Sequence, residues 1–224
     1  MIKKVKLKID GKEIETEEGK NVINVAKEIG IDIPILCYDA DKDQCLGTCR
    51  VCTIKWKRHY VAACVLKAEE GMDLTINNDE LKDLRKALVE LLFVEGNHFC
   101  PSCEKSGDCQ LQTLGYKLCM TAPRFHYRFN NHKIDFNAKK ILFEHNRCIL
   151  CKKCSNQFKD DNGQQVFFFN GKGAHLKIAM DLDRVNKLSE ERIDELIELC
   201  PVGALLKKGK GFDRPYGTRR YDNL

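Results

Sequence analysis

The fold of this chain is decided by the sequence CILCKKC at residues 148–154 and by the pair CP at residues 200–201. Three cysteines separated by two residues each place three thiolates in one loop, and the Cys-Pro pair adds a fourth from a distant part of the chain. A loop with three thiolates and one remote Cys-Pro is the arrangement that holds a [4Fe-4S] cluster. The sequence therefore predicts one such site, formed by Cys148, Cys151, Cys154 and Cys200.

This site lacks the second cluster of a two-cluster ferredoxin. Ferredoxins with two clusters contain the run Cys-x2-Cys-x2-Cys-x3-Cys-Pro twice, and the fourth cysteine of each run serves the other cluster. Here Phe158 occupies the fourth position of the run, and no second triplet precedes Cys200. We expect residues 152–173 to replace the surroundings of the missing cluster. The alternative is a zinc site, but zinc ribbons pair one Cys-x2-Cys with another, and three cysteines in one loop suit a cubane better.

The composition favours metal ligation over disulfide bonds. The 224 residues include 13 cysteines, an odd number, in clusters with short gaps, and residues 1–10 lack the apolar core of a signal peptide. These features predict a reducing, cytoplasmic location. The most apolar stretch, residues 87–94, is short and contains Glu90, so no membrane span is expected. The net charge of +5 is weak evidence for nucleic-acid binding, because thiolate-ligated clusters are anionic and would cancel most of it.

The first third of the chain predicts a small sheet with one helix. Apolar and charged residues alternate over residues 5–9, and the pair Asp10-Gly11 predicts a tight hairpin turn. Residues 21–29 have helical spacing and are followed by Gly30. Further short strands are predicted at residues 51–56, 60–63 and 72–76.

A hairpin, a helix and strands around a cysteine-bearing loop resemble the β-grasp ferredoxin domain. Gly47 fits this resemblance, since the loop backbone must pass close to a cluster and offer N–H groups to its sulfurs. Cys45 does not complete the plant-type spacing Cys-x4-Cys-x2-Cys, and we expect it to be a free thiol near the site. The resemblance selects four ligands for a [2Fe-2S] cluster: Cys37, Cys49, Cys52 and Cys64.

An amphipathic helix capped by Asn78 is predicted over residues 79–94, and a short one follows at residues 110–114. We expect the apolar stripe of the first helix to be core; it consists of Leu81, Leu84, Leu88, Leu91 and Leu92.

A third site lies between these two helices, where three cysteines need a fourth ligand. The candidate is His98, and the alternatives are Cys119 or an open iron position. A neutral imidazole in place of a thiolate should raise the reduction potential of a cluster. The predicted [4Fe-4S] ligands are His98, Cys100, Cys103 and Cys109.

Two basic segments also contain aromatic residues. In residues 123–140 this combination is compatible with nucleic-acid binding. No motif of a nucleic-acid reader is present, however, so we expect a connector that lies over the cluster domains. The end of the chain, residues 207–224, is rich in glycine and basic residues. A disordered end and a partner-docking arm are both compatible with that sequence.

The order of the three sites resembles the N-terminal electron-transfer module of the large iron-sulfur subunit of respiratory complex I, which also opens many iron-only hydrogenases. The strings EGNHFCPSCEKSG (95–107) and GFDRP (211–215), with residues 124–129, are similar to the small diaphorase subunit of NAD-reducing nickel-iron hydrogenases. In the complex I pattern three residues separate the histidine from the first cysteine, whereas here only Phe99 lies between them.

The resemblance implies an α+β chain in three parts. A β-grasp [2Fe-2S] ferredoxin domain is expected at residues 1–78, and a small helical domain with histidine and three cysteines at residues 79–137. A ferredoxin-like domain with a single [4Fe-4S] cluster is expected at residues 138–224.

The implied function is that of a non-catalytic electron-relay subunit of an NAD-linked hydrogenase. Its expected partners are a flavin/NAD(H)-binding diaphorase subunit, which would hold FMN and NAD, and a nickel-iron hydrogenase small subunit. The chain has no Gly-rich phosphate loop for a dinucleotide, so substrate chemistry is expected on those partners. The alternatives are the equivalent subunit of an NAD-dependent formate dehydrogenase or of a flavin-based electron-bifurcating complex, and a zinc-stabilised binding module.

Overall fold

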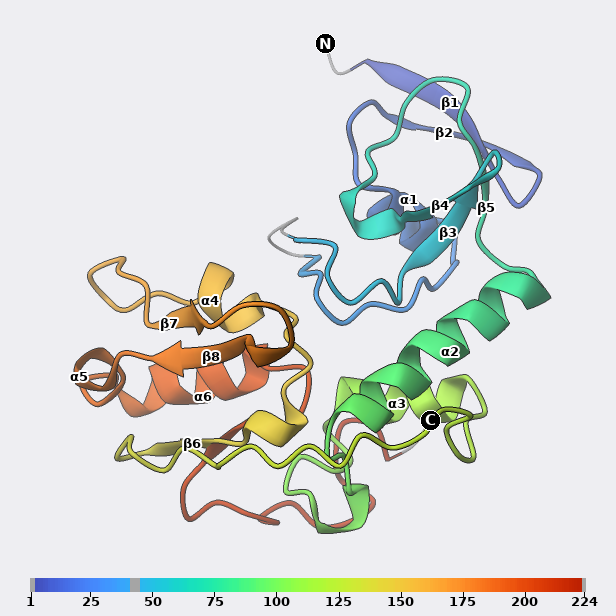
Figure 1. Cartoon of the computed structure of the whole chain (residues 1–224). Helices are drawn as coiled ribbons and strands as arrows, with labels where there is room; N and C mark the ends of the chain where they lie inside the picture. Colours follow the sequence, from blue (N-terminus) through green and yellow to red (C-terminus); the bar gives the residue numbers. More distant parts are fainter. Residues whose placement is uncertain (1–2, 41–44, 223–224) are drawn as a thin grey trace. The chain divides into compact units, whose positions relative to one another are not determined.

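The computed structural model describes residues 3–40 and 45–222, and it combines helices with sheets (Figure 1). This confirms the α+β class. The chain divides into two compact units, which we call the N-terminal unit (Met1–Val89) and the C-terminal unit (Glu90–Leu224). Helix α2 (Asp79–Glu95) contributes residues to both, and the three predicted domains with boundaries at 78 and 137 stay a prediction. Within the described ranges, no helix combines the length and the apolar character needed to cross a membrane.

The N-terminal unit is built on one mixed five-stranded sheet with the strand order β2-β1-β5-β3-β4. Strands β1 and β5 are parallel, and the other neighbours are antiparallel. The strands are β1 (Lys4–Ile9), β2 (Lys12–Glu17), β3 (Thr53–Trp56), β4 (His59–Ala62) and β5 (Asp73–Thr75).

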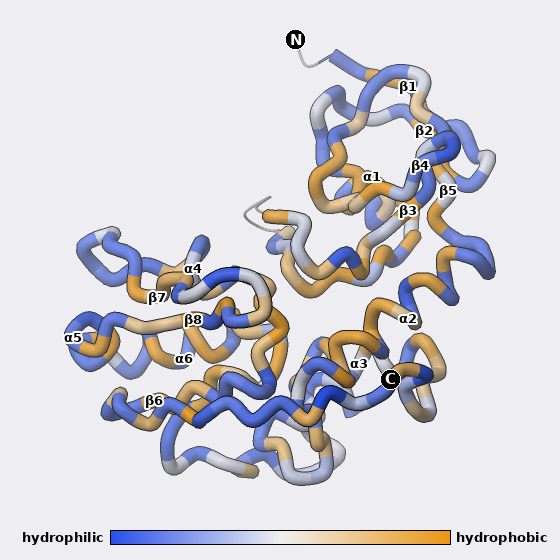
Figure 2. Tube along the Cα trace, viewed as in Figure 1, coloured by the Kyte–Doolittle hydropathy of each residue, from blue (hydrophilic) through white to orange (hydrophobic). Residues whose placement is uncertain are grey.

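The predicted hairpin and helix are confirmed. Asp10 and Gly11 both have positive φ (49° and 78°), which is the backbone of a two-residue type I′ turn. Every second residue of β1 is buried, and these side chains pack in one core with helix α1 (Val22–Glu28). The side chain of Asn21 caps α1 by accepting from the N–H of Ile23 at 2.9 Å. The hydrophobic colour on α1 in Figure 2 marks its contribution to this core.

Helix α2 begins as predicted but buries a different face. The side chain of Asn78 accepts from the N–H of Leu81 at 2.8 Å, which fixes the start of the helix. The predicted leucine stripe is only partly core, because Leu91 is 39% exposed. The face that is buried instead contains Leu81, Arg85 and Val89, which follow one another at four-residue intervals. A charged side chain therefore lies inside the N-terminal unit.

The C-terminal unit contains short elements. Two of its strand pairs are antiparallel: β6 (Ile141–Phe143) with β9 (Leu205–Lys207), and β7 (Phe167–Asn170) with β8 (Lys177–Met180). Its remaining α-helices are α3 (Gln110–Lys117), α4 (Lys153–Gln157), α5 (Leu182–Val185) and α6 (Glu190–Leu199). Single 3-10 turns occur at η1 (Ala63–Val65, in the N-terminal unit), η2 (Cys100–Ser102), η3 (His145–Arg147) and η4 (Gly173–His175).

Phe158 is buried in an aromatic contact of the C-terminal unit. The side chain of Phe158 is 1% exposed, and its ring centroid is 6.4 Å from that of Phe167 on β7. The guanidinium carbon of Arg192 on α6 lies 4.6 Å from the Phe158 ring centroid. Apolar packing thus surrounds the residue that takes the place of a fourth cysteine in the run.

Candidate metal centres

The predicted [2Fe-2S] ligands come together in the N-terminal unit, and all four are buried. Cys37 follows α1, the pair Cys49 and Cys52 precedes β3, and Cys64 lies in η1. The Sγ atoms of Cys37 and Cys49 are 3.3 Å apart. The side chain of Asn21 donates to the carbonyl of Cys64 at 2.8 Å, which anchors the last ligand to the start of α1.

Cys45 lies among these ligands. Its Sγ is 2.9 Å from that of Cys64 and 3.6 Å from that of Cys37, and the three sulfurs lie within 4.8 Å of one another. The N–H of Gly47 donates to the Cys45 Sγ at 3.0 Å. Gly47 has a φ of +64°, and a Cβ there would be 3.2 Å from Val65, so glycine suits this position.

The four cysteines of the CILCKKC site also converge. Cys148 is the C-cap of η3, Cys154 lies on α4, and Cys200 is the C-cap of α6. Burial raises the pKa of the Cys148 thiol to about 12 and raises those of Cys151 and Cys154, and the negative charges of the four thiolates would disfavour one another. Such thiols need bound iron to be held as thiolates. Each ligand of a cubane binds a different iron, so these sulfurs are not expected in contact.

The third set lies around η2 and α3. Cys100 begins η2, and Cys103 is its C-cap. Cys109 is the N-cap of α3, where its Sγ accepts from the N–H of Gln112 at 3.5 Å. Burial raises the pKa of all three thiols, that of Cys109 to about 12. The three sulfurs are close enough for charge repulsion to contribute to these shifts.

His98, two residues before Cys100 in the sequence, presents an orphaned nitrogen. Its Nε2 is buried and has no hydrogen-bond partner among the described residues. Burial, with a smaller effect of Arg147, lowers the imidazole pKa to about 4, so the ring is neutral at pH 7. The ring packs edge-on against Phe93 at 5.5 Å, and a Cβ at Gly96 would be 2.4 Å from Nε2. A neutral nitrogen that lacks a partner fits a metal ligand. Cys119, the alternative, is exposed just after α3.

The two predicted [4Fe-4S] sites share a segment of backbone that sequence reasoning did not identify. The carbonyl of Pro201 accepts from the N–H of Gln110 at 2.9 Å and lies 3.8 Å from the Cys109 Sγ. A Cβ at Gly203 would be 2.7 Å from the Cys103 Sγ, so only glycine fits there. No local pattern in the sequence indicates these contacts, because they join residues more than 90 positions apart, 92 for the pair Cys109 and Pro201.

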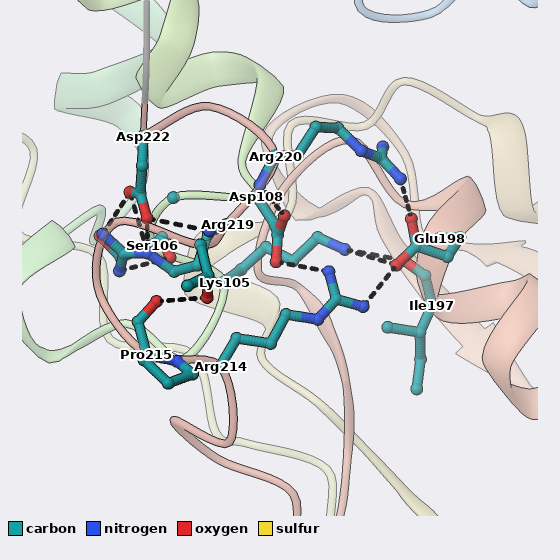
Figure 3. A network of polar contacts seen from close by, with 12 residues as sticks. Lys105, Ser106, Asp108, Ile197, Glu198, Arg214, Pro215, Arg219, Arg220 and Asp222 are labelled. Carbon is teal, nitrogen blue, oxygen red and sulfur yellow. Dashed lines mark hydrogen bonds and ion pairs between the residues drawn. The ribbon is translucent and has the colours of Figure 1, made fainter.

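The end of the chain binds the loop that joins Cys103 to Cys109 (Figure 3). The Nη1 of Arg219 donates to the Ser106 carbonyl at 2.9 Å, and the N–H of Tyr221 donates to the Gly107 carbonyl at 2.9 Å. The Arg220 N–H donates to a carboxylate oxygen of Asp108 at 3.0 Å, and the Arg220 guanidinium pairs with Glu198 at 2.7 Å. In the described part of the tail, up to residue 222, the basic residues therefore hold a ligand-bearing loop.

The chemistry of the donors fits iron-sulfur clusters in all three places. No disulfide joins any of the 13 cysteines, every one of which lies in the described ranges. The cysteines stand in three buried or half-buried groups, and backbone N–H groups donate to sulfurs in them, among them those of Cys45 and Cys109. The orphaned nitrogen of His98 belongs to the residue two positions before Cys100. These are the features by which a protein holds and tunes such clusters.

Three family models match successive parts of the chain. A 2Fe-2S iron-sulfur cluster binding domain matches residues 2–79. The NADH-ubiquinone oxidoreductase-G iron-sulfur binding region matches residues 85–124. The ferredoxin-like domain of NADH-quinone oxidoreductase subunit 3 matches residues 138–206.

Similar proteins fall into two groups. The 78 kDa subunit of mitochondrial NADH-ubiquinone oxidoreductase from Candida albicans is 29% identical over 98% of this chain, and the chain spans only 31% of that relative. By contrast, subunit gamma of the NAD-reducing hydrogenase HoxS from Cupriavidus necator is 45% identical over 97% of this chain and 93% of its own length. A solved NAD+-reducing [NiFe]-hydrogenase in the H2-reduced state matches with a TM-score of 0.86 and 34% identity, over 97% of this chain and 93% of that chain.

The predicted resemblance is therefore confirmed at both levels, the shared module and the specific subunit. Similarity to the complex I subunits ends with the module, whereas similarity to HoxS gamma extends over nearly the whole of both chains. The chain belongs to the family of the gamma subunit of NAD-reducing hydrogenases.

Proposed function

We propose that this chain is an electron-relay subunit of an NAD-linked hydrogenase, with one [2Fe-2S] and two [4Fe-4S] clusters. The observation that carries the proposal is the presence of three groups of buried or half-buried cysteines, each within a region that matches an iron-sulfur family model. Iron-sulfur clusters accept and donate single electrons. The electrons would pass between a flavin/NAD(H)-binding diaphorase subunit, which holds FMN, and a nickel-iron hydrogenase small subunit.

The proposed ligands are the residues selected from the sequence. The [2Fe-2S] set is Cys37, Cys49, Cys52 and Cys64. The first [4Fe-4S] set is His98, Cys100, Cys103 and Cys109, and the second is Cys148, Cys151, Cys154 and Cys200. These sets define the proposed domains at residues 1–78, 79–137 and 138–224.

The work of this chain is to position and tune the clusters, and no residue acts as an acid, a base or a nucleophile. The backbone link from Cys200 through Pro201 to Cys109 supports a direct route between the two [4Fe-4S] sites. Burial and backbone N–H donors set the environment of the sulfurs, which controls reduction potentials. A cytoplasmic location is proposed because 13 cysteines, an odd number in clusters with short gaps, favour a reducing compartment.

The experiment is anaerobic purification of the chain with its native partners. We expect brown protein with about ten irons per chain, the sum for one two-iron and two four-iron clusters. We also expect nickel-iron hydrogenase and flavin-containing subunits to co-purify. Colourless protein with stoichiometric zinc contradicts electron relay, and a molybdenum-containing partner contradicts the hydrogenase assignment.

A further inference from the structure

The predicted [2Fe-2S] site contains one more thiol than the cluster needs. A [2Fe-2S] cluster takes four cysteine ligands. Cys45 is a fifth, with its Sγ 2.9 Å from that of Cys64 and 3.6 Å from that of Cys37. The three sulfurs lie within 4.8 Å of one another, as metal ligands do. Cys45 is therefore close enough to bind the iron that Cys64 binds.

The backbone around Cys45 is also suited to a ligand. The N–H of Gly47 donates to its Sγ at 3.0 Å, and N–H donors of this kind stabilise a thiolate. Cys45 is half-buried, whereas Cys64 is buried and fixed through its carbonyl by Asn21 at 2.8 Å. The half-buried Cys45 sulfur thus already has an N–H donor that would stabilise it as a thiolate.

We propose that Cys45 is an alternative ligand of the [2Fe-2S] cluster that can replace Cys64. The inference rests on the proposed function, because it requires a cluster at this site. In the exchange the bond from iron to the Cys64 sulfur breaks and a bond from the same iron to the Cys45 sulfur forms. The Cys45 thiol loses a proton and the Cys64 thiolate gains one. No electron is transferred, so no oxidant or reductant is needed.

Geometry distinguishes Cys64 from the other ligands. The Cys45 Sγ lies 2.9 Å from the Cys64 Sγ but 3.6 Å from the Cys37 Sγ, so Cys64 is the nearer of the two. Cys52 lies outside this group among the residues that the structure describes. Cys45 should therefore replace Cys64 but not Cys52, and Cys52 provides a matched control within the same cluster.

The test uses the full-length chain with Cys64→Ala, Cys52→Ala, Cys45→Ala and the double variant Cys45→Ala/Cys64→Ala. Iron and sulfide content and the EPR spectrum of the reduced [2Fe-2S] cluster are measured after anaerobic purification. We expect Cys45→Ala to keep the cluster and Cys64→Ala to keep it with shifted g values. Cys52→Ala and the double variant should lose it. In every variant the [4Fe-4S] signals report that the C-terminal unit is intact.

The inference is overturned if Cys64→Ala loses the [2Fe-2S] cluster as fully as Cys52→Ala, or if the double variant keeps it. Should Cys64→Ala fail to fold, Cys64→Ser is compared with Cys45→Ala/Cys64→Ser. A spectrum that changes when Cys45 is removed supports ligation by Cys45, because sulfur and oxygen ligands give different spectra, and identical spectra contradict it. Absence of the [2Fe-2S] signal from the unmodified protein would instead contradict the proposed function.

Discussion

Arg85 brings a permanent positive charge into the core of the N-terminal unit. Its side chain is 3% exposed, and its Nε donates to the carbonyl of Thr53 at 3.1 Å, one residue after Cys52. The Nη2 has no hydrogen-bond partner among the described residues. Burial lowers the pKa of Arg85, while the nearby Cys52 thiolate and Asp10 carboxylate offset part of that effect. An anionic cluster ligated by Cys52 would provide the counter-charge that the guanidinium needs.

We therefore expect Arg85→Gln to make the reduction potential of the [2Fe-2S] cluster more negative. The reduced cluster carries one more negative charge than the oxidised cluster. Removal of the cation therefore costs the reduced form more electrostatic stabilisation. The shift should be on the order of tens of millivolts for a unit charge at an effective dielectric constant of about 20. A redox titration followed by EPR measures it.

Two variants separate charge from packing at this position. Arg85→Lys keeps the charge and should restore most of the potential. Lys82→Gln removes a charge from an exposed side chain of the same helix and should have a much smaller effect, because water screens that charge. Equal potentials in Arg85→Gln and the unmodified protein would show that the guanidinium does not act on the cluster.

His98 provides a second prediction at this scale. His98→Ala should remove or convert one [4Fe-4S] signal in the reduced EPR spectrum, because the buried Nε2 would no longer be available to iron. His98→Cys should keep the cluster and lower its potential, since a thiolate adds negative charge. Cys119→Ser, which changes the exposed alternative, should leave iron content unchanged. Three unaltered signals in His98→Ala would exclude His98 as a ligand.

The sequence identified candidate ligands because metal-ligand spacing is local. Two cysteines with a short gap, such as Cys100-x2-Cys103, lie close together in space whatever the surrounding fold, so the spacing itself indicates a cluster site. Arg85 could not be identified in the same way, because a lone arginine on an amphipathic helix ordinarily faces water. Arg85 lies four residues from both Leu81 and Val89, and this spacing was the only local sign that it shares their buried face. Cys45 likewise needed the fold, since its distance to Cys64 is set by the approach of two loops.

At the scale of elements, the segment after α6 connects two ligand groups. Residues 200–204 begin with the proposed ligand Cys200, place the Pro201 carbonyl on the N-terminus of α3, and lead into β9. Gly203 lies so close to the Cys103 sulfur that a Cβ would approach it to 2.7 Å. Contacts this short cannot persist, so either the segment or the Cys103 loop has to move.

Gly203→Ala is therefore expected to disturb the cluster bound by Cys103 more than the one bound by Cys148. The [4Fe-4S] signal of the first should broaden or disappear in the reduced EPR spectrum, while the [2Fe-2S] signal persists. Gly211→Ala is the matched control, because a Cβ there meets only the flexible side chain of Glu104, at 3.3 Å. Unchanged spectra for both variants would contradict the close packing of Gly203 on Cys103.

Elements with local signals were predicted well, and those set by distant pairing were not. The β1–β2 hairpin follows from its Asp10-Gly11 turn and its alternating residues. Strands β6 and β9 were missed because each has three residues and its partner lies at the other end of the C-terminal unit's sequence. The prediction that the leucine stripe on α2 is core is wrong at Leu91, because amphipathicity alone does not specify which apolar residues a neighbouring element covers.

For the whole molecule, the two units differ in what holds them together without iron. The N-terminal unit has a five-stranded sheet, and residues of β1 and α1 pack together in its hydrophobic core. The sheets of the C-terminal unit have two strands each, of three or four residues. Two-stranded pairs of this length are marginal by themselves, whereas a metal site that does not exist in the unfolded chain contributes its binding free energy to folding.

We expect removal of iron by a chelator under reducing conditions to unfold the C-terminal unit first. Hydrogen exchange of the full-length chain, read peptide by peptide, should show β6, β9 and α6 losing protection while β1 and β2 keep it. Each of the C-terminal unit's two predicted clusters has four ligands from segments that are otherwise joined by few regular hydrogen bonds, so its native state depends on the metal. The iron-loaded chain is the control and should protect both units. Simultaneous loss of protection across the chain, or earlier loss in β1 and β2, would show that the clusters do not stabilise the C-terminal unit selectively.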